Sequence, residues 1–338
     1  MTNPYLESPL APKIDDLKVG LPERAHILGQ PYRPRTGGQG GSQRGSTRLL
    51  EALKCPRKVW YAQAGVEEQT GLKSDAPSAR DVGTIFHQLA ADRWAREAPD
   101  PPSWAYVPLE ERLSGFPTPT LQYAAKLFEA AWPKVQAAMP IAPLTAEEEI
   151  PCTLRQLSEA AGEVSATIDW TDPYIGLFGP LSTEVVTALP DVLSYLGQSS
   201  GSHQIVIEDY KTKASRSGRL PTIDRRDAID WQGALYRLIV KAALTPVEIA
   251  GFTHVRVERV DPDPLEWGML PTVDRWPVPH PPLLMREAAR LARRAVRIER
   301  RVAAESFAPE PWGLANGACF GRFRDYPCSY LDLCLEGT

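Results

Sequence analysis

The first half of the chain carries apolar residues at helical spacing. They recur every three or four positions from Ser46 to Trp60, from Asp81 to Ala90 and over residues 119–138. Ser46 or Thr47 can cap the first of these helices, and Pro56 implies a kink or a new helix start within it. We therefore expect three helical regions before residue 140.

The second half changes to strand periodicity and then alternates strands with helices. Residues 173–203 contain glycine, proline and serine, and we interpret them as an insertion or an extended hairpin. Together the pattern predicts an α/β protein with a mixed central sheet flanked by helices. The predicted strands cover 149–154, 164–170, 204–211 and 247–260, and the predicted helices cover 225–243 and 284–305.

Residues 1–45 differ from the rest of the chain. They hold scattered prolines and the run Thr36-Gly37-Gly38-Gln39-Gly40-Gly41-Ser42-Gln43-Arg44-Gly45, which has too few apolar side chains to bury. We predict a flexible arm over 1–45, followed by one folded domain over 46–338.

Composition narrows the class of protein. The 338 residues are 43% hydrophobic with a mean hydropathy of -0.29, which is typical of a globular protein with a sizeable core. No apolar run approaches the ~20 residues that cross a bilayer, and the first residues lack the features of a secretory signal. We expect a cytoplasmic protein without a membrane partner. The net charge of -4 means that any surface for nucleic acid must be local.

The strand over 204–211 ends in the sequence Asp209-Tyr210-Lys211. Side chains alternate along a strand, so Asp209 and Lys211 point the same way. A carboxylate can hold a hard divalent cation, and a nearby ammonium can stabilise developing negative charge. Taken alone, this pair is more typical of a solvated ion pair on the surface.

Further polar residues follow in a fixed order around this pair. The segments are Gly83-Thr84-Ile85-Phe86-His87, Ile168-Asp169, Asp209-Tyr210-Lys211 and Gln232-Gly233-Ala234-Leu235-Tyr236. The ordered set resembles the PD-(D/E)XK nuclease superfamily, in particular its RecB- and AddB-like exonuclease branch. The resemblance implies the nuclease core fold for this chain.

The resemblance also implies roles for these residues. Asp169 and Asp209 would bind Mg2+ or Mn2+, with His87 as a further ligand and the Tyr210 carbonyl completing the shell. Lys211 would position the attacking water and stabilise the charge on the phosphorus. The remaining two residues, Gln232 and Tyr236, would contact the substrate or brace the site.

Two other carboxylates compete for places near the metal. Asp172 is a close rival of Asp169, although it can instead cap a turn, and Glu149 on the preceding strand matches a carboxylate of some relatives. The separation between Asp169 and Asp209 is longer than the short hairpin that is usual in this family.

The cysteines suggest a second metal centre. Cys55 stands in the first helix, and Cys319, Cys328 and Cys334 lie close to the end of the chain. This arrangement is similar to AddB-like nucleases and to the exonucleases associated with CRISPR adaptation, in which four cysteines hold a [4Fe-4S] cluster. Such a cluster would join the two terminal segments of the domain. By ligand count alone, zinc fits four thiolates equally well. Cys152 is interpreted as a small buried residue.

The last predicted helix is rich in arginine. Seven arginines fall within an arc of roughly 120° at ~100° per residue. Six of them are candidate contacts to nucleic acid, and the alternative is a solvated face paired with Glu287 and Glu299. The six are Arg286, Arg290, Arg293, Arg294, Arg297 and Arg301, and the seventh is Arg300.

These observations predict a Mg2+- or Mn2+-dependent exonuclease that cuts single-stranded or frayed DNA ends in recombination, repair or phage DNA processing. The alternative is a catalytically silent module that binds DNA or a partner protein. The chain has no Walker-type phosphate loop, so unwinding would need a helicase, and a recombination or CRISPR protein is another expected partner.

Overall fold

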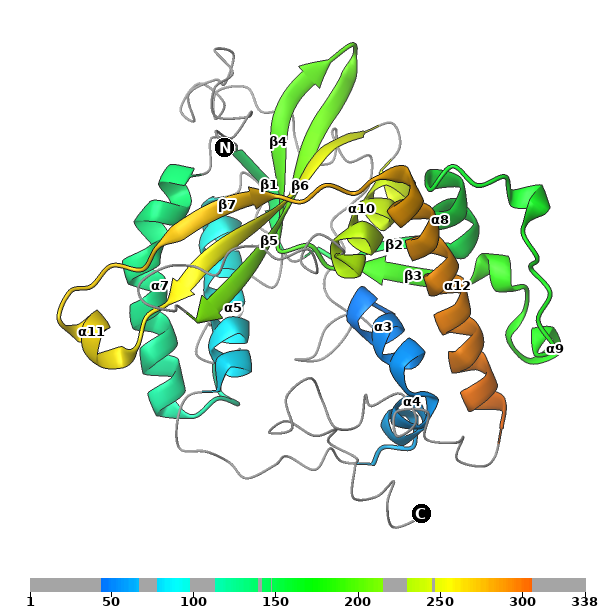
Figure 1. The fold of residues 1–338 in the computed structure, drawn as a ribbon, viewed down its shortest axis with the longest axis horizontal. Coiled ribbons are helices and arrows are strands. Elements are labelled where there is room, and N and C mark those ends of the chain that lie inside the picture. The colour runs from blue at the N-terminus through cyan, green and yellow to red at the C-terminus, as the bar shows by residue number, and fades with distance from the viewer. Residues whose placement is uncertain are drawn as a thin grey trace.

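The centre of the fold is a mixed five-stranded sheet (Figure 1). The computed structural model describes residues 44–66, 78–97, 113–138, 142–146, 148–214, 230–244 and 247–305. The strand order is β1-β4-β5-β6-β7, in which β5 and β6 are parallel and the other neighbours are antiparallel. The strands are β1 (Ala142–Ala146), β4 (Val192–Ser199), β5 (Ser202–Ala214), β6 (Glu248–Arg259) and β7 (Val273–Pro277).

Helices cover both faces of this sheet. On one face, here called the α5 side, Tyr210 of β5 packs into a core with α5 (Ala79–Glu97) and α7 (Thr118–Ala138). On the other face, the α10 side, Ile205 and Ile207 pack against α10 (Trp231–Ala243). Figure 1 shows α5 and α7 together at one side of the sheet, with α10 at the other. Because side chains alternate along β5, the strand supplies both cores, and it is buried as the apolar run in its sequence predicts.

A second layer lies beyond α10. It contains α3 (Ser46–Lys54), α4 (Pro56–Gln63), α8 (Leu154–Ala160) and α12 (Pro282–Ala304), and α12 packs against the other three and α10. A two-stranded antiparallel sheet of β2 (Ile150–Thr153) and β3 (Val185–Ala188) joins the same core. The described residues also form short helical turns: η2 (Ser165–Thr167), α9 (Ile175–Phe178), η3 (Leu181–Thr183) and α11 (Pro262–Glu266).

The predicted kink in the first helix is confirmed. Cys55 has an extended backbone with φ of -155°, and it separates α3 from α4, which begins at Pro56. A proline is well placed there. Backbone N–H groups in the first turn of a helix have no acceptor within the helix, so a residue that lacks an N–H loses no hydrogen bond.

The predicted strand over 164–170 is wrong. Residues 165–167 form a 3-10 turn, and the residues that follow make no strand. Val164 is 65% exposed, so the alternating pattern here reflects a surface loop rather than a half-buried strand.

The segment over 173–203, interpreted as an insertion or an extended hairpin, contributes to the main sheet as part of a hairpin. It contains β3 and β4, and β4 is an interior strand of the main sheet that forms a hairpin with β5. The hairpin turns at Ser200 and Gly201, which both have positive φ, and a register shift occurs between Tyr195 and Gly197. These irregular positions explain the turn-like sequence of what is a core strand.

Candidate active site

Polar side chains converge where β4 begins and β5 approaches its end. Val192 pairs with Glu208, so Asp191 lies directly opposite Asp209. The Tyr210 amide donates a hydrogen bond of 2.5 Å to Oδ2 of Asp191. Two carboxylates are thereby fixed side by side at the base of one hairpin.

Lys211 follows on the same face of β5 as Asp209. Its Nζ lies 2.7 Å from Oδ2 of Asp209, and its side chain is 27% exposed against 4% for Asp209. Burial opposes the ammonium charge, but Asp209 and Asp191 outweigh that effect and raise the pKa of Lys211 above its ordinary value. The lysine is therefore a permanent cation that borders solvent.

His87 reaches the carboxylates from helix α5. Its Nδ1 lies 3.1 Å from Oδ1 of Asp191. Gly83, one turn earlier, allows this approach, because a Cβ there would stand 3.2 Å from Oγ1 of Thr212 on β5. Burial alone would lower the pKa of His87, yet the nearby Asp191 and Asp209 raise it to about 9.

The environments of Asp209 and Asp191 shift the pKa values of the two carboxyl groups in opposite directions. Burial is the largest influence on Asp209, and together with repulsion from Asp191 it raises the pKa of the Asp209 carboxyl despite Lys211 and His254. Burial also acts on Asp191, but His87, Lys211 and the Tyr210 amide hold the pKa of that carboxyl below its usual range. A bound cation would relieve this repulsion between the two carboxylates.

Gln232 and Tyr236 approach from the first turns of α10. The Gln232 amide nitrogen lies 3.4 Å from the Tyr236 hydroxyl. Burial, then Asp209 and Asp191, raise the pKa of Tyr236 to about 12, so the hydroxyl remains a neutral donor near both carboxylates. The structure thus brings together His87, Asp209, Lys211, Gln232 and Tyr236, which the sequence singled out.

Asp169 is not part of this cluster. Its exposed carboxylate accepts hydrogen bonds from the backbone amide and hydroxyl of Thr171, and its carbonyl accepts one from Arg297 of α12. Its rival Asp172 forms a buried ion pair with Arg300, and Glu149 is buried before β2 in the smaller sheet. The position beside Asp209 belongs to Asp191 instead.

Sequence reasoning missed three residues of the cluster. Asp191 stands in the segment Leu189-Pro190-Asp191-Val192, and this Pro-Asp step just ahead of a short apolar run was the available signal. Asp230 and His254 lie 3.0 Å apart between Oδ2 and Nε2, and the same nitrogen of His254 is 3.4 Å from Oδ2 of Asp209. Nothing in the local sequence marks this second contact.

The arginines of α12 divide into two groups. Arg293 and Arg300 are buried: Arg293 binds Glu163 and Ser158, and Arg300 binds Asp172 and Glu184. Arg293 is one of the six candidate contacts to nucleic acid, and its burial instead gives it a role inside the fold, as it does for Arg300. The more open arginines are Arg286, Arg290, Arg294, Arg297 and Arg301, of which Arg290 pairs with Glu287, Arg301 pairs with Glu305, and Arg297 donates to the carbonyls of Asp169 and Thr171.

The cysteine positions are described only in part. Cys55 is buried between α3 and α4, and Cys152 is buried in β2, where burial raises its pKa to about 12. Cys319, Cys328 and Cys334 lie outside the described residues. Among the residues that the structure describes, no group of three or more His, Cys, Asp or Glu side chains is arranged to hold a metal ion.

A cation at Asp191 and Asp209 would consequently rely on ligands other than a third acidic or imidazole side chain. Mg2+ is commonly bound by one or two carboxylates and completes its shell with waters and substrate phosphates. The two carboxylates and the adjacent Tyr210 carbonyl fit that pattern.

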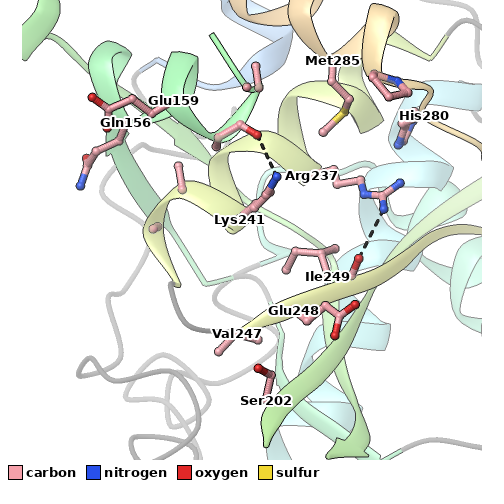
Figure 2. A pocket seen from close by; sticks show the side chains of 16 residues that line it. Gln156, Glu159, Ser202, Arg237, Lys241, Val247, Glu248, Ile249, His280 and Met285 are labelled. Atoms are coloured by element: carbon pink, nitrogen blue, oxygen red, sulfur yellow. Dashed lines mark hydrogen bonds between the residues drawn. The ribbon is translucent and has the colours of Figure 1, made fainter. Parts of the chain in front are cut away.

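A cavity of about 1140 Å³ opens elsewhere, at the other end of α10 (Figure 2). Lys241 and Arg237 line it and donate to the carbonyls of Ala160 and Ile249. His280 closes one end, and burial lowers its pKa to about 4. The cavity borders the beginnings of β5 and β6, whereas the carboxylates lie toward their ends, so the two sites are separate.

The mixed sheet and the carboxylate–lysine cluster at its hairpin define an α/β protein of the nuclease type. The family model described as the PD-(D/E)XK nuclease superfamily matches residues 46–334. The chain belongs to this superfamily. A search of curated proteins gives no significant match. Within the described part of the chain, every helix is too short or too polar to cross a membrane.

Proposed function

We propose that this protein is a divalent-metal-dependent deoxyribonuclease, acting as an exonuclease on single-stranded or frayed DNA ends. The observation that carries the proposal is the convergence of Asp191, Asp209 and Lys211 at the base of the β4–β5 hairpin in a mixed sheet. Membership in a nuclease superfamily supports hydrolysis of phosphodiester bonds.

Each residue has a role that its position supports. Asp191, Asp209 and the Tyr210 carbonyl would hold Mg2+ or Mn2+, which when bound neutralises phosphate oxygens and acidifies water. His87 donates to Asp191 and orients it, and its expected role as a direct ligand stays a prediction. Lys211, cationic and bordering solvent, is placed to stabilise negative charge on the phosphate.

The test is digestion of end-labelled DNA by EDTA-treated protein with and without added Mg2+ or Mn2+. We expect cleavage that depends on the metal, and its loss in Asp209→Ala and in Lys211→Ala. Lys213→Ala is the matched control, since this lysine lies on the same strand two residues further from the carboxylates. Equal cleavage by the protein and by Asp209→Ala would overturn the proposal. Single- and double-stranded substrates, labelled at either end or circular, separate exonuclease from endonuclease action.

We propose that Arg286 and Arg294 contact the DNA backbone, because both are exposed and no ion pair to either is present among the described residues. Replacing both by glutamine should weaken DNA binding and flatten its salt dependence. A helicase or a protein of the recombination or CRISPR-adaptation type is the proposed partner.

A cluster ligated by Cys55, Cys319, Cys328 and Cys334 is a separate proposal. Cys55 supports it as a free, buried cysteine at the junction of two helices. Anaerobically purified protein should be brown and contain about four irons per chain. A colourless protein with one zinc would favour zinc instead.

A further inference from the structure

His254 connects the carboxylate cluster to helix α10. It lies on β6, where it is the parallel-sheet partner of Asp209 on β5. Phe252, two residues earlier, packs in the core on the α10 side, so His254 points to that side as well. Its Nε2 lies between two carboxylates, 3.4 Å from Oδ2 of Asp209 and 3.0 Å from Oδ2 of Asp230.

Asp230 is itself held at the start of α10. Its carbonyl accepts the Ala234 amide, and its carboxylate lies beside Gly233. The turn has no room for a larger residue at Gly233, because a Cβ there would collide with Asp230 Oδ2 and would stand 2.9 Å from the Phe252 ring. A small residue at this position therefore lets Asp230 reach His254.

We propose that Asp230 and His254 are positioning residues that fix the carboxylate of Asp209 for metal binding. The inference deepens the proposed function and rests on it. The Nε2–H of His254 donates to Asp230, so Asp230 selects the tautomer and the ring orientation that also present this N–H edge to Asp209. Lys211 Nζ lies 2.7 Å from the same oxygen, so the ammonium and the imidazole enclose the carboxylate and restrict its rotation. Groups that orient a ligating carboxylate typically contribute 10–100-fold to metal affinity.

The direct test is Mn2+ binding to EDTA-treated full-length protein in the absence of DNA. Electron paramagnetic resonance measures the binding. We expect His254→Leu and Asp230→Ala to weaken Mn2+ binding by about 10–100-fold. His254→Gln, whose amide nitrogen can reach the place of Nε2, should stay within about threefold of the unmodified protein. His254→Asn, with the same group on a shorter side chain, should behave like His254→Leu. Gly233→Ala should weaken binding because it displaces Asp230 while both side chains remain.

His203→Leu, at the other end of the hairpin, is the matched control and should bind Mn2+ normally. Circular dichroism shows which variants fold. If His254→Leu does not fold, the comparison of His254→Gln with His254→Asn tests the positioning role instead. Normal Mn2+ binding by His254→Leu, or equal weakening by His254→Gln and His254→Asn, would overturn the positioning role. Equal binding by the unmodified protein and Asp209→Ala would instead refute the proposed metal site, so the two failures are distinguishable.

Discussion

Arg300 of α12 and Asp209 of β5 are both almost fully buried charges, but their surroundings differ. Arg300 donates to Asp172, to Glu184 and to the carbonyls of Phe178 and Gly179. Asp209 faces a second carboxylate, Asp191, and its pKa is raised by burial and by that neighbour. The arginine donates hydrogen bonds to every one of these neighbours, whereas the two carboxylates repel each other, and a bound cation would relieve that repulsion. The first arrangement joins distant segments of the fold, and the second is the one that we propose for metal binding.

The largest effect should come from breaking the arginine cluster. Arg300→Met removes the ion-pair partner of buried Asp172 and leaves Glu184 paired with Arg44, and we expect the free energy of unfolding to fall by about 3–5 kcal/mol. Urea denaturation followed by circular dichroism measures it. Arg286→Met, on the exposed face of the same helix, should change stability by no more than about 0.5 kcal/mol. Equal stability of the two variants would contradict a stabilising role for the buried contacts of Arg300.

Substitutions at Asp191 and at Asp169 should have very different effects on the rate of DNA cleavage. Asp191→Asn removes a carboxylate of the cluster, and we expect a loss on the order of 10³-fold in cleavage rate, or about 4 kcal/mol. Asp169→Asn changes an exposed residue and should stay within about twofold. Rates on end-labelled DNA with saturating Mg2+ provide the measurement. The opposite ranking would restore Asp169 as the second carboxylate.

The His87–Asp191 pair should make stability depend on pH in metal-free protein. The pKa of His87 is about 9 in the folded chain against an ordinary 6.5, so its contribution is fully present below pH 6.5 and is lost as pH rises through 9. We expect His87→Gln to lose at most about 3 kcal/mol at the acidic end and little above pH 9. Denaturation at several pH values checks this. In an Asp191→Asn background the pH dependence should become smaller, because Asp209 still acts on His87. A stability difference between the unmodified protein and His87→Gln that stays constant with pH would contradict the prediction.

The smallest effect should be a gain. Asp209→Asn removes a buried charge whose ionisation the fold opposes, so metal-free protein should become more stable by about 1 kcal/mol while activity is lost. Thermal or urea unfolding in EDTA measures the change. Asp274→Asn, which weakens the ion pair with Arg256, should be destabilising instead. A loss of stability in both variants would show that Asp209 is held as well as Asp274.

The sequence predicts the relative positions of site residues well when they share one strand or one helix. Asp209 and Lys211 share a strand, and Gln232 and Tyr236 share a helix, so their relative placement follows from local geometry. His87 was found by its order in the superfamily pattern. The α/β class and the helices around the sheet were likewise predictable from periodicity.

The misses arise from contacts between segments. The sequence over 164–170 alternates like a strand, but no neighbouring strand pairs with it, whereas β4 contains a bulge and a glycine and still pairs on both sides. Asp191, Asp230 and His254 reach Asp209 through strand register and a helix start, which a single sequence does not encode locally. The burial of Arg293 and Arg300 depends on partner residues in distant segments of the sequence.

The hairpin of β4 and β5 has a practical consequence for experiments. Its turn at Ser200 and Gly201 lies about 25 Å from Asp209 along the strand, at roughly 3.3 Å per residue, and both residues are exposed. A cysteine and fluorophore introduced at Ser200 would be rigidly connected to the carboxylates without touching them. Energy transfer from such a label to an acceptor on a DNA end would report the arrival and departure of substrate in real time.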